Sequence, residues 1–112
     1  MELVSKFVGD VILFTYKGWL DATFSEKVED QILEMLTPER RKVILNLKGT
    51  EYISSGGLRT LLDISKHVNG KQGKFVVCEV QPQVRDIIAM AGFNKFISVM
   101  PTEELAFKYL ES

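Results

Sequence analysis

Short apolar runs alternate with segments of helical periodicity along this chain, and that alternation limits its fold more than any other feature. Residues 43–47 form an almost continuously apolar run, typical of a strand covered on both faces. A helical pattern precedes it, with Phe24, Val28, Ile32 and Met35 on one stripe, and a second pattern follows from residue 54. Strands that alternate with helices are joined by right-handed crossovers and pair mainly in parallel. The pattern therefore predicts an α/β domain.

The other expected elements complete a single mixed sheet. Residues 3–8 and 11–17 are β-rich runs separated by Gly9-Asp10, which predicts a tight antiparallel hairpin. The later elements are expected in this order: a helix ending at Asn69-Gly70, a strand over 74–80, a helix from Pro82 to Gly92, a short strand over 96–99 and a helix starting at Thr102. The predicted order is β-β-α-β-α-β-α-β-α, with a mainly parallel sheet.

Length and composition indicate one soluble domain spanning residues 1–112. Hydrophobic residues make up 46% of the chain and charged residues 26%, the mix of an ordinary globular protein. The net charge of -1 favours neither a nucleic-acid nor a membrane partner. Arg40, Arg41 and Lys42 are consecutive cations before a strand and are expected to be a solvated loop.

The redox and targeting signals favour the cytoplasm. Cys78 is the single cysteine and lies in an apolar run, so we expect a small core side chain and no internal disulfide. The first residues lack a basic region followed by an apolar stretch, so no signal peptide is expected. No run approaches the roughly 18 apolar residues of a membrane span.

The candidate site is Ser54-Ser55-Gly56-Gly57, where a buried strand leads through a short turn into a helix. Backbone N–H groups at a helix N-terminus attract anions, and the helix dipole adds to that attraction. A phosphate on Ser55 would sit where these donors could receive it. Serine is equally among the preferred N-cap residues, so these residues alone leave structural capping and phosphorylation both open.

Two motifs resemble those of STAS domains. Tyr52-Ile53-Ser54-Ser55-Gly56-Gly57-Leu58-Arg59-x-Leu-Leu is similar to the STAS signature, and Gly18-Trp19-Leu20-Asp21 resembles the family's earlier Gly-x-Leu/Ile-Asp element. The element order agrees from end to end, so the resemblance covers all 112 residues. It implies an anti-sigma factor antagonist that binds an anti-sigma factor with serine kinase activity, frees the sigma factor, and lets go when phosphorylated. A phosphatase would be a further partner.

The resemblance also implies site residues. Ser55 matches the phospho-acceptor, while Ser54 stands where aspartate is common and Gly56 where Ser, Thr or Ala is usual. Ser54 is therefore an alternative acceptor or the true N-cap. The expected partner-binding surface comprises Trp19, Asp21, Ser54, Gly56, Gly57, Leu58 and Arg59. Asp21 could instead simply cap a helix beginning near Ala22.

Other chemistries have little support in the sequence. His67 is the single histidine and lies twelve residues beyond Ser55, roughly 18 Å along one helix. Neither a nucleophile elbow nor a nucleotide-binding glycine motif is present, so we expect no enzyme, no cofactor and no metal site. Two alternatives remain: a STAS scaffold or subunit of a signalling or transport complex that is never phosphorylated, and a protein that binds nucleotide at the same helix start.

Overall fold

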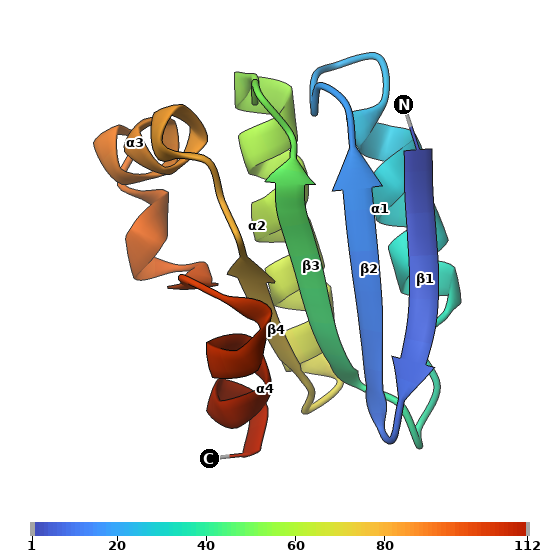
Figure 1. Cartoon of the computed structure of the whole chain (residues 1–112). Helices are drawn as coiled ribbons and strands as arrows, with labels where there is room; N and C mark the ends of the chain where they lie inside the picture. Colours follow the sequence, from blue (N-terminus) through green and yellow to red (C-terminus); the bar gives the residue numbers. More distant parts are fainter. Residues whose placement is uncertain (1, 112) are drawn as a thin grey trace.

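The computed structural model describes residues 2–111 and shows a mixed sheet with helices on both faces (Figure 1). The elements run in this order: β1 Glu2–Val8, β2 Val11–Lys17, α1 Ser25–Glu34, β3 Lys42–Gly49, α2 Ser55–Gly70, β4 Lys74–Cys78, α3 Pro82–Met90, a 3₁₀ turn Phe93–Lys95, β5 Ser98–Met100 and α4 Glu103–Glu111. The predicted order is confirmed, and the short 3₁₀ turn is the one element added to it.

The strands lie in the sheet in the order in which they occur in the chain, β1-β2-β3-β4-β5. β1 is antiparallel to β2, and every later pair is parallel. Right-handed crossovers that all advance in one direction place their helices on the same face. Accordingly α1 and α2 lie behind the sheet in Figure 1, whereas α4 lies in front of it.

Two apolar clusters occupy the two faces of the sheet. The larger cluster packs α1, α2 and α3 against one face, and the smaller packs α4 against the other. β3 contributes to both, because Val43 and Leu45 belong to the first cluster and Ile44 to the second. Residues 43–47 are all buried, which explains the continuous apolar run seen in the sequence.

The turns agree with the sequence in some places and differ in others. The hairpin forms at Gly9, which has φ +61°, and α3 is followed by Gly92 at φ +77°. α2 ends at Gly70 as expected, and the left-handed residue that follows it is Gln72, at φ +62°. β4 ends at Cys78 and not at residue 80, because Glu79 has φ +55° and breaks the extended backbone.

Two further boundaries are displaced. The last strand occupies Ser98–Met100, two residues beyond the expected start, because residues 93–95 form the 3₁₀ turn. α1 begins at Ser25 and not near Ala22, since residues 22–24 form a turn before the helix. The predicted apolar stripe of α1 is nevertheless the face it buries, with Val28 and Ile32 in the core.

Candidate functional site

The two motif segments leave the carboxyl ends of neighbouring parallel strands, β2 and β3, and are hydrogen-bonded to each other. The Leu20 amide donates to the Tyr52 carbonyl (3.0 Å), and the Ser54 amide donates to the Leu20 carbonyl (3.0 Å). Nearer the strands, the Gly18 amide donates to the Gly49 carbonyl (3.0 Å). The sheet therefore holds the Gly18–Asp21 turn directly beside the start of α2.

Gly57 closes the packing between these segments. A Cβ at this position would clash with the carbonyl oxygen of Leu20 and would lie 2.8 Å from Cγ1 of Ile53. Gly56 has no such restriction, since its Cβ would lie 3.6 Å from the Cα of Ala22. The first turn of α2 can approach the Leu20 backbone because residue 57 has no side chain.

The two serines of the motif have different structural roles. Ser54 is the N-cap of α2, and its hydroxyl accepts the Gly57 N–H at 3.2 Å. Serine here supplies the acceptor oxygen that an aspartate would otherwise provide. Ser55 is the first helical residue and is exposed, with no hydrogen bond to its hydroxyl within residues 2–111. The free hydroxyl beside the helix start is that of Ser55.

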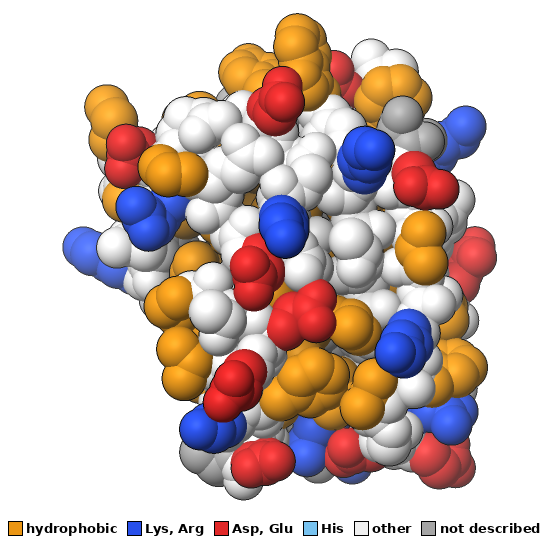
Figure 2. All heavy atoms as spheres, viewed as in Figure 1, with side chains coloured by type: hydrophobic (Ala, Val, Ile, Leu, Met, Phe, Trp, Pro, Cys, Tyr) orange, Lys and Arg blue, Asp and Glu red, His pale blue; other side chains and the backbone are white. Residues whose placement is uncertain are grey.

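An exposed aromatic pair stands beside the helix start. Trp19 is 57% exposed and Tyr52 43% exposed, and their ring centroids lie 5.4 Å apart at an interplanar angle of 59°. Figure 2 shows hydrophobic side chains gathered at the top of the view, above the ends of β2 and β3. Tyr52 was missing from the sequence-based set, although the pairing of two aromatic-bearing loops at adjacent strand ends could have identified it.

The Trp19 turn is anchored from below by Tyr16. The buried Tyr16 hydroxyl donates to the Trp19 carbonyl at 2.6 Å, and Thr50 Oγ1 donates to the Tyr16 carbonyl at 3.2 Å. Burial, followed by the negative charge of Asp21, raises the pKa of Tyr16 above its ordinary value. The backbone that presents Trp19 is thus fixed by a neutral, buried hydroxyl.

Asp21 has a structural role in the turn that precedes α1. Its Oδ1 accepts the amide of Thr23 at 3.0 Å and that of Phe24 at 3.3 Å. The expected capping interaction therefore exists, but it caps a turn and not the helix itself, which begins at Ser25. Asp21 is half-buried, so any contact with a partner would be additional to this role.

The remaining predicted contact residues fall into two groups. Arg59 is exposed and forms no ion pair within the described chain, whereas Gly57 and Leu58 are buried. Leu58 is 6% exposed and belongs to the larger core cluster. Gly57 and Leu58 therefore support the surface from beneath, and the exposed part of the site is formed by Trp19, Tyr52, Ser55 and Arg59.

The other reactive side chains lie away from this surface. Cys78 is fully buried in the smaller cluster, and burial raises the pKa of its thiol to about 12. His67 lies near the far end of α2, where Nδ1 is 3.0 Å from the Asp63 carbonyl oxygen. Across residues 2–111 no three His, Cys, Asp or Glu side chains cluster to hold a metal ion. In the same range no helix is both long and apolar enough to cross a membrane.

The fold and these motifs define a STAS-type domain, and a family model agrees. The model described as the STAS domain matches residues 2–106. The chain belongs to the STAS domain family.

Two relatives match nearly the whole chain. An anti-sigma F factor antagonist of Paenibacillus polymyxa is 32% identical over 104 residues, which cover 90% of this chain and 87% of the relative. BtrV of Bordetella bronchiseptica, provisionally named an anti-sigma factor antagonist, is 29% identical over 106 residues, covering 95% of this chain and 91% of BtrV.

Solved structures share the fold at lower identity. A Thermotoga maritima protein with the same provisional name superimposes with a TM-score of 0.90 at 17% identity, covering 98% of this chain and 95% of that one. The anti-sigma factor antagonist SpoIIAA in its unphosphorylated form gives a TM-score of 0.74 at 18% identity, covering 99% of each chain. At these identities the likeness concerns the fold.

Proposed function

We propose that this protein is a cytoplasmic anti-sigma factor antagonist, a binding module and not an enzyme, whose partner affinity is controlled by phosphorylation of Ser55. Family membership and the two relatives named as antagonists support the class. The observation that carries the residue assignment is the difference between the two serines. The Ser54 hydroxyl is engaged as the N-cap, while the Ser55 hydroxyl is exposed and free.

A phosphate on Ser55 is compatible with the folded domain. The amides of Ser55 and Gly56 have no partner among the described residues, and both point from the amino end of α2, where the helix dipole favours an anion. Arg59 lies four residues further on, so it shares the helix face of Ser55, and its side chain leans toward the helix start. The phosphate would gain charge-assisted hydrogen bonds from these groups.

The same phosphate would disfavour a tight complex. It adds nearly two negative charges and three acceptor oxygens to the middle of the exposed surface. An anti-sigma factor that packs against Trp19, Tyr52 and Ser55 would have to desolvate that charge. A penalty of about 3 kcal/mol corresponds to a loss of more than a hundredfold in affinity. Phosphorylation would therefore release the partner.

The decisive experiment is phosphate mapping with matched serine variants. The protein is incubated with its anti-sigma kinase and ATP, and the site is read by mass spectrometry in wild type, Ser54→Ala and Ser55→Ala. We expect incorporation to persist in Ser54→Ala and to vanish in Ser55→Ala. Full incorporation in Ser55→Ala would overturn the assignment, and no incorporation in wild type would favour the unphosphorylated scaffold.

A further inference from the structure

The outer edge of β1 is open along the whole strand. The sheet order leaves β1 and β5 as the two edge strands, and β5 has only three residues, all half-buried. Ser98 of β5 is also hydrogen-bonded to the Tyr109 hydroxyl on α4, with 2.7 Å between the two oxygens. β1 has seven residues, pairs with β2 without a register shift, and is exposed except at Leu3. Shortness, bulges and covering elements normally protect a sheet edge, and β1 has none of these among the described residues.

The hairpin determines which backbone groups of β1 face outward. Gly9-Asp10 is a two-residue loop, so Val8 and Val11 form the hydrogen-bonded pair that closes it. Because bonded and non-bonded pairs alternate along an antiparallel ladder, every second residue counted back from Val8 also bonds β2. Outside this ladder, no hydrogen bond to the β1 backbone occurs within residues 2–111. The outward-facing N–H and C=O groups are those of Leu3, Ser5 and Phe7.

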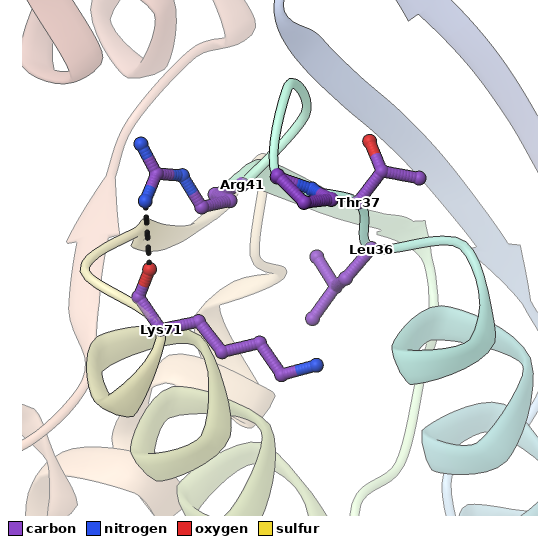
Figure 3. A pocket seen from close by; sticks show the side chains of 5 residues that line it. Leu36, Thr37, Arg41 and Lys71 are labelled. Atoms are coloured by element: carbon purple, nitrogen blue, oxygen red, sulfur yellow. Dashed lines mark hydrogen bonds between the residues drawn. The ribbon is translucent and has the colours of Figure 1, made fainter.

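The hairpin end of β1 is held in place by the loop between α1 and β3. The Arg40 guanidinium lies 4.1 Å from the centre of the Phe7 ring, and its Nε donates to the Gly9 carbonyl at 3.5 Å. In the same loop, Arg41 Nη1 donates to the Lys71 carbonyl at 3.2 Å (Figure 3). The solvated loop expected from the sequence is therefore correct for the exposed Arg41 but not for Arg40. A strand that is already ordered loses little entropy when it pairs.

The side chains of β1 suit an antiparallel copy of the same strand. Glu2 lies at the start of β1 and Lys6 near its end. A parallel pair in register would place each charge against its own copy, whereas an antiparallel pair places Glu2 diagonally across from Lys6 of the second copy. Overlap of the whole strand centres the pair on Ser5, and Leu3 then lies opposite Phe7 of the second copy. These opposite residues are the ones with outward-facing backbone groups, so each such pair can exchange two hydrogen bonds.

We propose that two copies of this chain pair through β1, antiparallel and centred on Ser5, and so join their sheets into one. The contact is isologous, because each copy offers the same edge to the other. The Trp19 turn follows β2 and lies at the amino end of β1, so the two Ser55 surfaces lie at opposite ends of the joined sheet. A contact between two strand edges is at the small end of specific interfaces, below about 1,200 Å², so the dimer is reversible, with a dissociation constant of about 10–300 µM.

Amide hydrogen exchange followed by ¹H–¹⁵N NMR tests the pairing residue by residue, and sedimentation velocity gives the mass. Both are measured at about 20 µM and about 1 mM protein. We expect the mass to rise toward that of a dimer, and the amides of Leu3, Ser5 and Phe7 to exchange roughly twofold or more slowly at the higher concentration. The amides of Val4 and Lys6 already bond β2 and should change less. A monomeric mass at about 1 mM, or association that leaves the three outward amides unchanged, would overturn the proposal.

Matched variants at Ser5 test the backbone contact. Ser5→Pro removes an outward N–H, which an edge strand tolerates, and should weaken the dimer about tenfold or more. Ser5→Thr keeps that N–H and should dimerise within about twofold of wild type. The NMR spectrum of each variant at low concentration reports its fold directly. Equal dimerisation of the two variants would show that this edge is not the contact.

Charge reversal tests the antiparallel direction. Lys6→Glu places two carboxylates near each other across the contact and should weaken the dimer severalfold. Adding Glu2→Lys to Lys6→Glu restores opposite charges and should recover most of the lost affinity. Lys27→Glu makes the same charge change on the exposed side of α1 and should alter dimerisation less than about twofold. A double variant that stays as weak as Lys6→Glu, or an equal effect of Lys27→Glu, would contradict the proposed pairing.

Discussion

The Gly57 Cα faces the carbonyl oxygen of Leu20 so closely that no Cβ fits between them. This contact joins the first turn of α2 to the segment that carries Trp19, and the Ser54-to-Leu20 hydrogen bond reinforces it. The position of Ser55 relative to the aromatic pair is therefore set by backbone packing. A substitution that moves these backbones apart would alter the surface formed by Trp19, Tyr52, Ser55 and Arg59 without changing an exposed side chain.

Gly57→Ala and Gly56→Ala form a matched pair that tests this packing. A methyl group at residue 57 would meet the Leu20 carbonyl, and overpacking of this kind costs roughly 1–3 kcal/mol in the free energy of unfolding. At residue 56 the methyl finds ordinary contact distances, and replacing glycine in a helix gains about 0.5–1 kcal/mol. Urea denaturation of both variants measures the difference. Equal stability of the two would show that the contact is not restrictive.

The two serines should affect stability differently. Ser54→Ala removes the side-chain cap of α2 and is expected to lower the free energy of unfolding by about 0.5–2 kcal/mol. Ser55→Ala removes an exposed, unbonded hydroxyl and should change it by less than about 0.5 kcal/mol. Thermal or urea unfolding of both variants provides the test, and a larger loss in Ser55→Ala would contradict the assigned roles.

Trp19 offers a built-in reporter of partner binding, because it is the single tryptophan in the chain. Its emission should be that of a largely exposed indole in the free protein and should shift to shorter wavelength when the anti-sigma factor covers it. Trp19→Ala should weaken the complex by about 2 kcal/mol or more while leaving unfolding nearly unchanged. The partner used should contain no tryptophan, or have its tryptophans replaced, so that the emission comes from Trp19 alone. An unshifted emission in the saturated complex would remove Trp19 from the interface.

Ser55→Glu should reproduce the phosphorylated state only in part. A carboxylate supplies one charge and two oxygens, whereas phosphoserine supplies nearly two charges and three oxygens. The variant should stay folded and gain a few tenths to about 1 kcal/mol from the helix dipole. Calorimetric titration against the anti-sigma factor should rank affinities as wild type, then Ser55→Glu, then phosphoprotein. Wild-type affinity in both modified forms would show that charge at Ser55 does not control the partner.

Stability should decline in alkali because two buried groups hold their protons more tightly in the folded state. Burial raises the pKa of Cys78 to about 12, so the unfolded chain, with an ordinary thiol, loses its proton first. The contribution of Cys78 to the free energy of unfolding is complete below about pH 8.5. It is lost as pH rises toward 12, at up to about 1.4 kcal/mol per pH unit. The raised pKa of Tyr16 acts in the same direction above about pH 10. Urea unfolding between pH 8 and 10.5 measures this effect. The free energy of unfolding should fall less steeply with pH for Cys78→Ala than for wild type.

The same burial predicts the reactivity of the thiol. At pH 8 the raised pKa leaves roughly a thousandfold less thiolate than an ordinary cysteine has, and the side chain is also inaccessible. Iodoacetamide should therefore modify the native protein at least a hundredfold more slowly than the urea-unfolded one. Comparable rates in both states would mean that β4 opens readily.

Much of the fold could be predicted from local patterns in the sequence. The apolar run of β3, the stripe of α1 and the Gly9 hairpin each depend on neighbouring residues, so all three were predictable. The misplaced ends lack such a local signal. Gln72 and Glu79, which flank β4, adopt positive φ although neither is a residue type that favours it.

The sequence predicted where the candidate residues lie in the fold, but not which of them are exposed. The helical pattern that begins at residue 54 predicted Ser55 at a helix start. The Trp19 turn was expected beside it because the two motifs follow neighbouring strands. Burial of Leu58, exposure of Tyr52 and the Asp21 hydrogen bonds depend on packing across two strand ends, which no local pattern records. A test of whether Asp21 contacts a partner should therefore use Asp21→Asn. This variant removes the charge but keeps an oxygen that can accept the turn's hydrogen bonds.

Because the strands lie in the sheet in chain order, each new strand docks on the free edge left by the strand before it. No strand has to be inserted between two that are already paired. The amino end of the chain emerges first from the ribosome. β1, β2 and β3 can therefore pair while the rest of the chain is still being synthesised. The Gly18–Asp21 turn and the start of α2 both precede residue 60, and α2 ends at Gly70. The surface formed by Trp19, Tyr52, Ser55 and Arg59 is thus among the first parts of the protein to be synthesised.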